Sequence, residues 1–195
     1  MISQTHKFIF IHIPGTGGTS IEFGLKNYQS GELCGVGGGI WEPEKSIKEK
    51  IESIHGKSIC LNAKHMTALQ WKEVLGDEYD NYYKFTIVRH PLDKAMSLFK
   101  FNNQKPLQQP DWIIEQALFV TDNDGNIIID DVYKFEDLQN SWKSICKKLN
   151  ITHESLPHKN NRNPKKETIN SIIDEKEINE LKLMTELDFK LFNYK

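Results

Sequence analysis

The chain has 195 residues, of which 38% are hydrophobic and 27% are charged, and its formal net charge is −2. This composition is ordinary for a globular protein, and the length suits one domain, residues 1–195, with a sizeable core. The near-neutral charge excludes a general attraction to nucleic acid or to a membrane surface. An anion site would therefore have to be local.

The cysteine pattern argues against a disulfide-stabilised or zinc-binding protein. Cys34, Cys60 and Cys146 lie far apart and form no C-x-x-C pair. This usage fits a reducing compartment such as the cytoplasm. No stretch approaches the ~20 apolar residues of a membrane span, and the short apolar run near the N-terminus lacks a signal-peptide cleavage site. The oligomeric state stays open.

Predicted strands alternate with predicted helices along the chain. The continuous apolar run at 7–13 predicts a buried strand, and residues 19–28 predict a helix. Residues 30–43, which contain five of the glycines, predict a loop that is either a connector or a lid. We expect further helices at 45–56, 67–82, 90–101, 111–120, 135–150 and 174–192, with a C-terminal cap at Gly76 and an N-terminal cap at Asp111. We also expect strands at 58–63 and 82–89, and a turn at Asp124–Gly125 between β-favouring stretches.

This alternation predicts a single α/β domain of the P-loop-like, three-layer kind. Its central sheet would be mostly parallel and flanked by helices. In such folds, ligands bind beyond the carboxyl ends of the strands. The residues that directly follow the strands at 7–13 and 82–89 are therefore the first places to look for a site.

The sequence after the first strand, "PGTGGTS" at 14–20, predicts a phosphate-binding loop. Glycines let the backbone approach a ligand closely, and successive N–H groups next to a helix N-terminus form an anion nest. The alternative is a tight strand-to-helix turn that binds nothing. A Walker A loop needs a Gly-Lys pair, and this loop has none. The predicted donors are in Gly15, Thr16, Gly17, Gly18, Thr19 and Ser20.

Several stretches resemble one enzyme family in the same order along the chain. "FIHIPGTGGTS" is similar to the 5′-phosphosulfate loop, usually "hIPKTGGTS", of bacterial and Golgi carbohydrate sulfotransferases. Their sulfate donor is 3′-phosphoadenosine 5′-phosphosulfate (PAPS). "YYKFTIVRHPLDKAMSLF" resembles the segment that grips the 3′-phosphate, which implies that role for Arg89 and Ser97. "KHMTALQW" resembles the segment with the candidate catalytic histidine, here His65. Weaker similarities lie at 124–138, 156–162 and 187–194.

The loop departs from the family at one position. Gly15 stands where the family has a lysine that is thought to neutralise charge on the leaving phosphate oxygen. Either the chain lacks this cation or another one replaces it, with Lys64, Lys159 and Arg162 as candidates. Arg162, in the basic run at 158–166, is also our candidate for a further contact to the 3′-phosphate.

Other candidate residues have ordinary structural alternatives. Without the family resemblance, His65 would be interpreted as a surface histidine. The alternative for Arg89 is a buried salt bridge, but the match of a guanidinium to a phosphate favours the site. His12 is expected in the core, because it lies within the first strand. The tryptophans either stack on an adenine or a sugar or, as is more usual, pack in the core or at its rim. They are Trp41, Trp71 and Trp112.

The sequence thus predicts transfer of a sulfuryl group from PAPS to a hydroxyl of a carbohydrate or another small molecule, without a metal. His65 would accept the hydroxyl proton. One alternative is a module that binds PAPS or its product PAP without turnover, which the missing lysine favours. A P-loop kinase or NTPase is a third possibility, against which the absence of a Walker lysine and of a clear Walker B acid argues. The acceptor itself is not predicted.

Overall fold

A computed structural model describes residues 1–34, 40–102, 115–152, 154–156 and 169–195. Within these residues, the central sheet has the strand order β1-β2-β5-β6. β1 pairs with β2 in antiparallel fashion, and the pairs β2–β5 and β5–β6 are parallel. The strands are β1 (Ile2–Ser3), β2 (Phe8–Ile11), β5 (Tyr83–Val88) and β6 (Asp131–Lys134).

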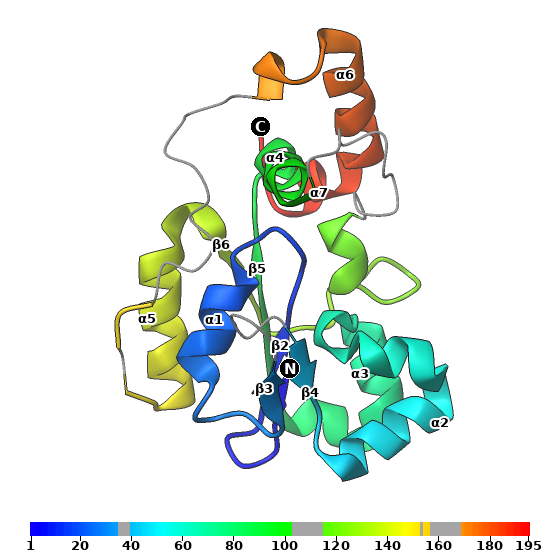
Figure 1. The fold of residues 1–195 in the computed structure, drawn as a ribbon, viewed down its shortest axis with the longest axis vertical. Coiled ribbons are helices and arrows are strands. Elements are labelled where there is room, and N and C mark those ends of the chain that lie inside the picture. The colour runs from blue at the N-terminus through cyan, green and yellow to red at the C-terminus, as the bar shows by residue number, and fades with distance from the viewer. Residues whose placement is uncertain (35–39, 103–114, 153, 157–168) are drawn as a thin grey trace.

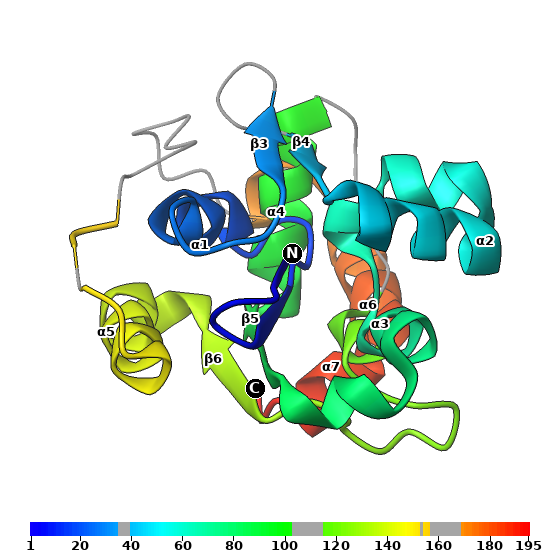
Figure 2. The same cartoon turned by 90° about the horizontal axis from the view of Figure 1, so that it is seen from below.

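Helices cover both faces of this sheet. Figures 1 and 2 show α1 (Gly18–Leu25) and α5 (Leu138–Leu149) on one side, with α2 (Lys45–Leu61) and α3 (Ala68–Leu75) on the other. The result is a mixed α/β fold with a mostly parallel central sheet, which confirms the fold class predicted from the alternation of strands and helices.

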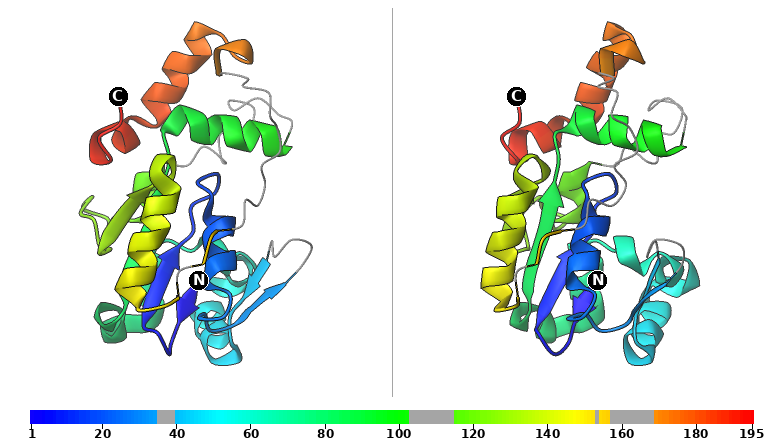
Figure 3. Two further views of the ribbon diagram at one scale, coloured as in Figure 1. Left: turned by 90° about the vertical axis from the view of Figure 1, so that its left-hand side faces the viewer. Right: turned by 60° about the vertical axis from the view of Figure 1, so that its left-hand side comes forward.

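Three further helices lie beyond the carboxyl ends of the strands. They are α4 (Pro91–Asn102), α6 (Glu175–Met184) and α7 (Glu186–Leu191). Figure 3 shows α4 crossing above the sheet, with α6 and α7 beside it. α4 contacts α6, and α7 contacts the short 3₁₀ turn η5 (Gln116–Phe119). These elements enclose the edge of the sheet at which ligands of such folds bind.

The inner strands form because their residues are apolar without interruption. All four residues of β2 are fully buried, as expected for a strand that is covered on both faces. Phe10 stacks on Phe85 of β5 with ring centroids 5.3 Å apart, and Phe8 packs against the same ring at 6.2 Å. This aromatic core holds the ends of β2 and β5 side by side.

The predicted strand at 58–63 is wrong. Residues up to Leu61 continue α2, which kinks at Gly56, where φ is +81°. Cys60 and Ala63 are buried, whereas Leu61 is 78% exposed. This spacing buries one face of a helix, which a short apolar run cannot reveal by itself. The 3₁₀ turn η1 (Ala63–His65) follows directly.

The predicted loop at 30–43 contains an antiparallel pair of strands, β3 (Glu32–Cys34) and β4 (Ile40–Glu42). The loop prediction was therefore wrong for these two segments, because the cross-strand pairing is not visible in a glycine-rich sequence. Residues 35–39 lie outside the described residues.

Helix ends were predicted more accurately than these strands. α3 ends at the expected cap, Gly76, whose N–H donates to the Lys72 carbonyl, and η2 (Gly76–Asn81) follows. The helices predicted near 90–101 and 135–150 are confirmed as α4 and α5. Of the helix expected at 111–120, the described part is the turn η5, and the expected cap, Asp111, lies outside the described residues.

Candidate active site

The glycine-rich loop connects the carboxyl end of β2 to the first turn of α1 (Figure 1). Gly15 and Gly17 both have φ of +82°, a left-handed conformation that glycine adopts without strain. Thr16 is fully buried, and its Oγ1 donates a hydrogen bond of 2.9 Å to the Ile13 carbonyl. The Thr16 side chain thus anchors the loop, and the groups that the loop can offer to a ligand belong mainly to its main chain.

The main chain of this loop can serve as an anion cradle. Among the described residues, the backbone amides of Gly15, Thr16 and Gly17 donate no hydrogen bond. The Gly18 and Thr19 amides at the start of α1 add donors that have no acceptor within the helix, together with the positive end of the helix dipole, whereas the Ser20 amide donates to the Gly17 carbonyl at 3.0 Å. Thr19 is half-buried in this first turn, and Ser20 is buried.

Gly18 has a packing role besides any ligand role. A Cβ at this position would lie 2.3 Å from Cδ2 of His12, closer than real atoms approach. The first turn of α1 therefore rests directly on a buried histidine ring. The structural alternative for the glycine run, a tight turn, is at least part of the explanation for Gly18.

Gly15 lies beneath α4. A Cβ at this position would be 3.3 Å from Cγ of Lys94 and 3.4 Å from Cγ of Leu98. A lysine at position 15 would need both the left-handed backbone and space between these side chains. The backbone conformation and the packing at position 15 therefore disfavour the lysine that the family has there.

The stem of Lys94 packs against Gly15, and its ammonium group is buried. It is 3% exposed, and burial lowers its pKa to about 8, although Asp188 and Glu115 raise it in part. Ser97 is half-buried on α4, three residues after Lys94. Residues three apart are neighbours on a helix surface. Ser97 therefore lies near the face of α4 that covers the loop, and no described contact joins it to Arg89.

Arg89 follows β5 and reaches the loop. Its Nη1 donates to the Gly15 carbonyl at 3.3 Å, and its guanidinium carbon lies 4.2 Å from the centre of the Phe135 ring. Its Nε is buried and has no hydrogen-bond partner among the described residues. Burial lowers the pKa of Arg89, with Asp93, Glu136 and Tyr194 opposing the effect. A half-buried guanidinium with an unused donor is suited to bind an anion.

Phe135 is a site residue that the sequence did not single out. Its ring lies under the Arg89 guanidinium and also faces Gly17, where an added Cβ would be 2.7 Å from Cε2 of the ring. It thereby sets the spacing between the loop and the strand end of Arg89. The β-favouring stretch before it was a signal for burial but not for this contact.

His65 lies in η1, after a helix rather than after the strand that we expected. Its Nδ1 is 3.0 Å from the backbone carbonyl of His12. Because a carbonyl only accepts, Nδ1 carries the proton, and the lone pair of the neutral ring is on Nε2. Burial lowers the pKa of His65 to about 3, and the neighbouring His12 adds to this effect. The ring is therefore neutral at physiological pH.

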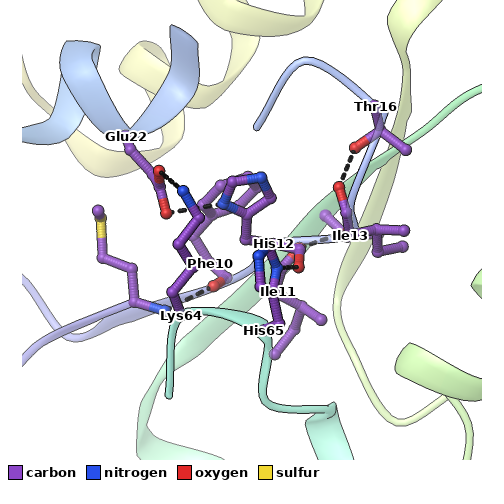
Figure 4. Close-up of polar contacts among 10 residues, drawn as sticks. Phe10, Ile11, His12, Ile13, Thr16, Glu22, Lys64 and His65 are labelled. Carbon is purple, nitrogen blue, oxygen red and sulfur yellow. Dashed lines mark hydrogen bonds and ion pairs between the residues drawn. The ribbon is translucent and has the colours of Figure 1, made fainter. Parts of the chain in front are cut away.

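A buried polar cluster lies between the loop and His65 (Figure 4). His12 Nδ1 and Lys64 Nζ contact the two oxygens of Glu22 at 2.7 Å and 3.1 Å. Burial lowers the pKa of His12, so its neutral ring donates to the carboxylate. Burial alone would raise the pKa of Glu22, but His12 and Lys64 outweigh it and lower the pKa to about 2. The expected core placement of His12 is confirmed, since it is 4% exposed.

The ammonium of Lys64 is thus drawn to Glu22, and whether it also serves as the substitute cation stays a prediction. Glu22 was missed by the sequence reasoning. A signal was available, because Glu22 shares the buried face of α1 with Ile21 and Leu25. An acid on such a face requires buried partners.

The remaining candidates lie in the core or outside the described residues. Trp41 and Trp71 are 2% and 0% exposed, with ring centroids 6.0 Å apart, which matches the core interpretation. Arg162, Lys159 and Trp112 lie outside the described residues. Within the described ranges, no group of three or more His, Cys, Asp or Glu side chains could hold a metal ion, and no helix is long and apolar enough to span a membrane.

Comparison with known proteins assigns the family. The model of the sulfotransferase family matches residues 1–123, which include the loop, His65, Arg89 and Ser97. No curated protein and no solved structure matches the chain. Since the match covers more than half of the chain, this protein belongs to the sulfotransferase family.

Proposed function

We propose that this member of the sulfotransferase family transfers a sulfuryl group from PAPS to a hydroxyl of a carbohydrate or another small molecule. Family membership supports sulfuryl transfer in general. The observation that carries the choice of donor is Arg89, whose buried Nε has no described partner and whose Nη1 contacts the glycine-rich loop. PAPS carries a 5′-phosphosulfate and a 3′-phosphate, so it would use the loop and this arginine together.

The loop residues 15–20 would hold the 5′-phosphosulfate. Left-handed backbone at Gly15 and Gly17 and the N-terminus of α1 supply main-chain donors, and Thr19 and Ser20 add hydroxyls. These donors suit a phosphosulfate, which carries negative charge over several oxygens. PAPS supplies the activated sulfuryl group, and the chain supplies position and charge stabilisation.

Arg89 and Ser97, with Arg162, would hold the 3′-phosphate. A guanidinium matches a phosphate through two parallel hydrogen bonds, and Nε is one of the donors in that fork. The stacking of Arg89 on Phe135 fixes the plane in which the fork is presented. The guanidinium contacts a carbonyl and an aromatic face, and Asp93 and Glu136 stabilise its charge in part, while its Nε donor has no described partner.

His65 would be the general base. Its Nε2 would take the proton from the acceptor hydroxyl as the oxygen bonds to sulfur and the bond from sulfur to the 5′-phosphate oxygen breaks. The hydrogen bond from Nδ1 to His12 fixes the tautomer that this step needs. The low pKa keeps the base in its active, neutral form, although it also makes it a weak base.

The second candidate function is a module that binds PAPS or PAP without turnover. The observation that favours it is Gly15, whose backbone and packing disfavour the family's lysine. A kinase or NTPase activity is a third candidate that the same measurements test. We also propose that residues 1–195 act as one domain and use no metal. The free thiols of the three cysteines support a reducing compartment for the protein.

Calorimetric titration with PAP, ADP and ATP tests the donor site. Hydrogen bonds to charged groups contribute about 1.5–3 kcal/mol each, so PAP should bind at least ten times more tightly than ADP. Equal affinities would contradict the proposed donor, and a preference for ATP would favour a nucleotide hydrolase or kinase. A transfer assay with PAPS and a panel of hydroxyl acceptors separates the enzyme from the binding module.

A further inference from the structure

The backbone of Arg89 is clamped by one buried amide. Gln116 of η5 is fully buried, and its Oε1 accepts the Arg89 N–H at 2.8 Å. Its Nε2 donates to the Arg89 carbonyl, also at 2.8 Å. Both polar groups of the Arg89 backbone are therefore used by a single side chain, which fixes the strand end from which the guanidinium extends.

Gln116 is in turn oriented by α7. Its Nε2 also donates to Oδ2 of Asp188 at 3.1 Å, and Oδ1 of Asp188 accepts the Ala117 N–H at 2.8 Å. Asp188 is fully buried and lies near Lys94 and Glu115, with which it interacts electrostatically. With both amide protons of Gln116 donated to acceptors, rotation of this amide would break the clamp on Arg89.

The residue after Arg89, His90, is also held by contacts that lead to the C-terminal segment. Oε1 of Glu136 accepts the His90 N–H at 2.7 Å, and the Tyr194 hydroxyl donates to Oε2 of Glu136 at 3.1 Å. The His90 ring packs edge-on against Phe189 and Tyr194, each at 5.4 Å between centroids. The strand end at 89–90 is thus held on two sides by residues of 186–195.

We propose that the C-terminal segment 186–195 is part of the anion site, with Asp188 as a positioning residue for Arg89. The segment lies outside the part of the chain that the family model matches, residues 1–123. Among the described residues, its hydrogen bonds reach the Arg89 backbone through Gln116 and the His90 backbone through Glu136, so we infer that it sets where the guanidinium is held. The identity of the bound group, a 3′-phosphate, rests on the proposed function.

The test is a double-mutant cycle with calorimetry, using PAP and ADP as probes. Asp188→Asn replaces one of the two carboxylate oxygens with an NH2 group, so the side chain can no longer accept from both Gln116 Nε2 and the Ala117 N–H, which weakens the clamp. We expect about a tenfold loss of PAP affinity and less than a twofold change for ADP, as for residues in one hydrogen-bond network. In an Arg89→Ala background, the same change should cost PAP affinity nothing further. Equal losses in both backgrounds, or no loss, would overturn the proposal.

The matched control is Phe192→Leu, which alters buried packing of the same segment, at a residue that is 5% exposed, without touching Gln116. It should lower the melting temperature and leave the PAP-to-ADP affinity ratio unchanged. If Asp188→Asn does not fold, Glu136→Gln at an exposed site replaces it, with an expected two- to threefold loss of PAP affinity. An unchanged PAP affinity in that folded variant would overturn the proposal.

A second readout separates this inference from the proposed function. If the wild type binds PAP and ADP equally, the donor assignment fails, and the ¹⁵N resonance of Arg89 Nε decides the inference without any ligand. Broadening or a shift of this resonance in Asp188→Asn or Glu136→Gln, but not in Phe192→Leu, supports positioning by the C-terminal segment. An unchanged resonance in these variants overturns it.

Discussion

The loop at 15–20 and the strand end at Arg89 offer an anion two different kinds of donor. The loop offers mainly backbone N–H groups, whose positions follow from left-handed glycines and from the start of α1. The strand end offers one long side chain, stacked on Phe135 and held through Gln116. The loop is set by local conformation, whereas Arg89 is set by contacts distant in the sequence.

This difference teaches where substitutions should act. In the loop, a side-chain change acts by altering the backbone or its packing, because the donors themselves belong to every residue type except proline. At Arg89, a side-chain change removes the donor itself. The two regions should therefore respond differently to mutation, to added charge and to pH.

The largest expected effect lies outside both regions, at His65. His65→Ala should lower turnover by roughly 10²–10⁴-fold with little change in PAP affinity, because it removes the base and leaves both anion donors in place. Single-turnover sulfate transfer and PAP titration measure the two quantities. His55→Ala, at a histidine of α2 that pairs with Glu73, is the control and should leave both unchanged. Unchanged turnover in His65→Ala would mean that His65 is not the base and has a structural role.

Arg89→Ala should have the next largest effect and should separate the two kinds of donor. We expect PAP affinity to fall by about 10- to 150-fold, since a charge-assisted contact is worth about 1.5–3 kcal/mol, with a much smaller change for ADP. Arg89→Lys keeps the charge but loses the planar fork, so it should recover part of the affinity. Titration calorimetry checks both. An equal loss for PAP and ADP would mean that Arg89 serves the loop rather than the 3′-phosphate.

Substitutions at Gly15 test whether the loop needs a cation besides Arg89. Gly15→Ala and Gly15→Lys share the strain of a left-handed backbone, about 1–2 kcal/mol, and the contact with Lys94. They differ in the ammonium group. We expect Gly15→Lys to transfer sulfate at least tenfold faster than Gly15→Ala at similar PAP affinity, because the charge acts mainly in the transition state. Equal rates would show that Lys64, Lys159 or Arg162 already fills the role.

Acid should destabilise the loop side through its buried histidines. The folded pKa of His65 is about 3 and that of His12 is also lowered, so the unfolded chain binds more protons below pH 6.5. Stability should therefore fall as the pH drops below 6.5, by up to about 1.4 kcal/mol per pH unit for each histidine. Urea unfolding at pH 7.5 and 5.5 measures the slope. His65→Asn keeps a donor for the His12 carbonyl without titrating, and it should reduce the slope, whereas an unchanged slope would contradict the assignment.

The parts that could be predicted from the sequence depend on local signals. The apolar run of β2, the glycine loop and the C-terminal cap of α3 are short-range patterns, and they appear in the structure close to where they were predicted. The strand expected at 58–63 failed because a short apolar run fits a helix as well as a strand. The family was also predicted from local motifs and is confirmed by the match to residues 1–123.

The arrangement of the site depends on long-range contacts that no local pattern encodes. Gln116 reaches Arg89 across 27 residues, and Asp188 reaches Gln116 across 72. Phe135 lies under Arg89 only because β6 pairs with β5. The roles of His65, Arg89, Ser97 and the loop donors stay predictions, while the neighbours that would tune them became visible only in the folded chain.

The parallel pairing of β2 with β5 has a consequence for the order of folding. Phe8 pairs with Tyr83, and the Thr86 hydroxyl donates to the Ile11 carbonyl at 2.7 Å across 75 residues. Closing so long a loop costs entropy before any contact is gained, and parallel pairing of distant strands is slow. During synthesis, β2 gains its partner β5 only after residue 88 has left the ribosome, and Arg89 gains its full support only when Asp188 follows.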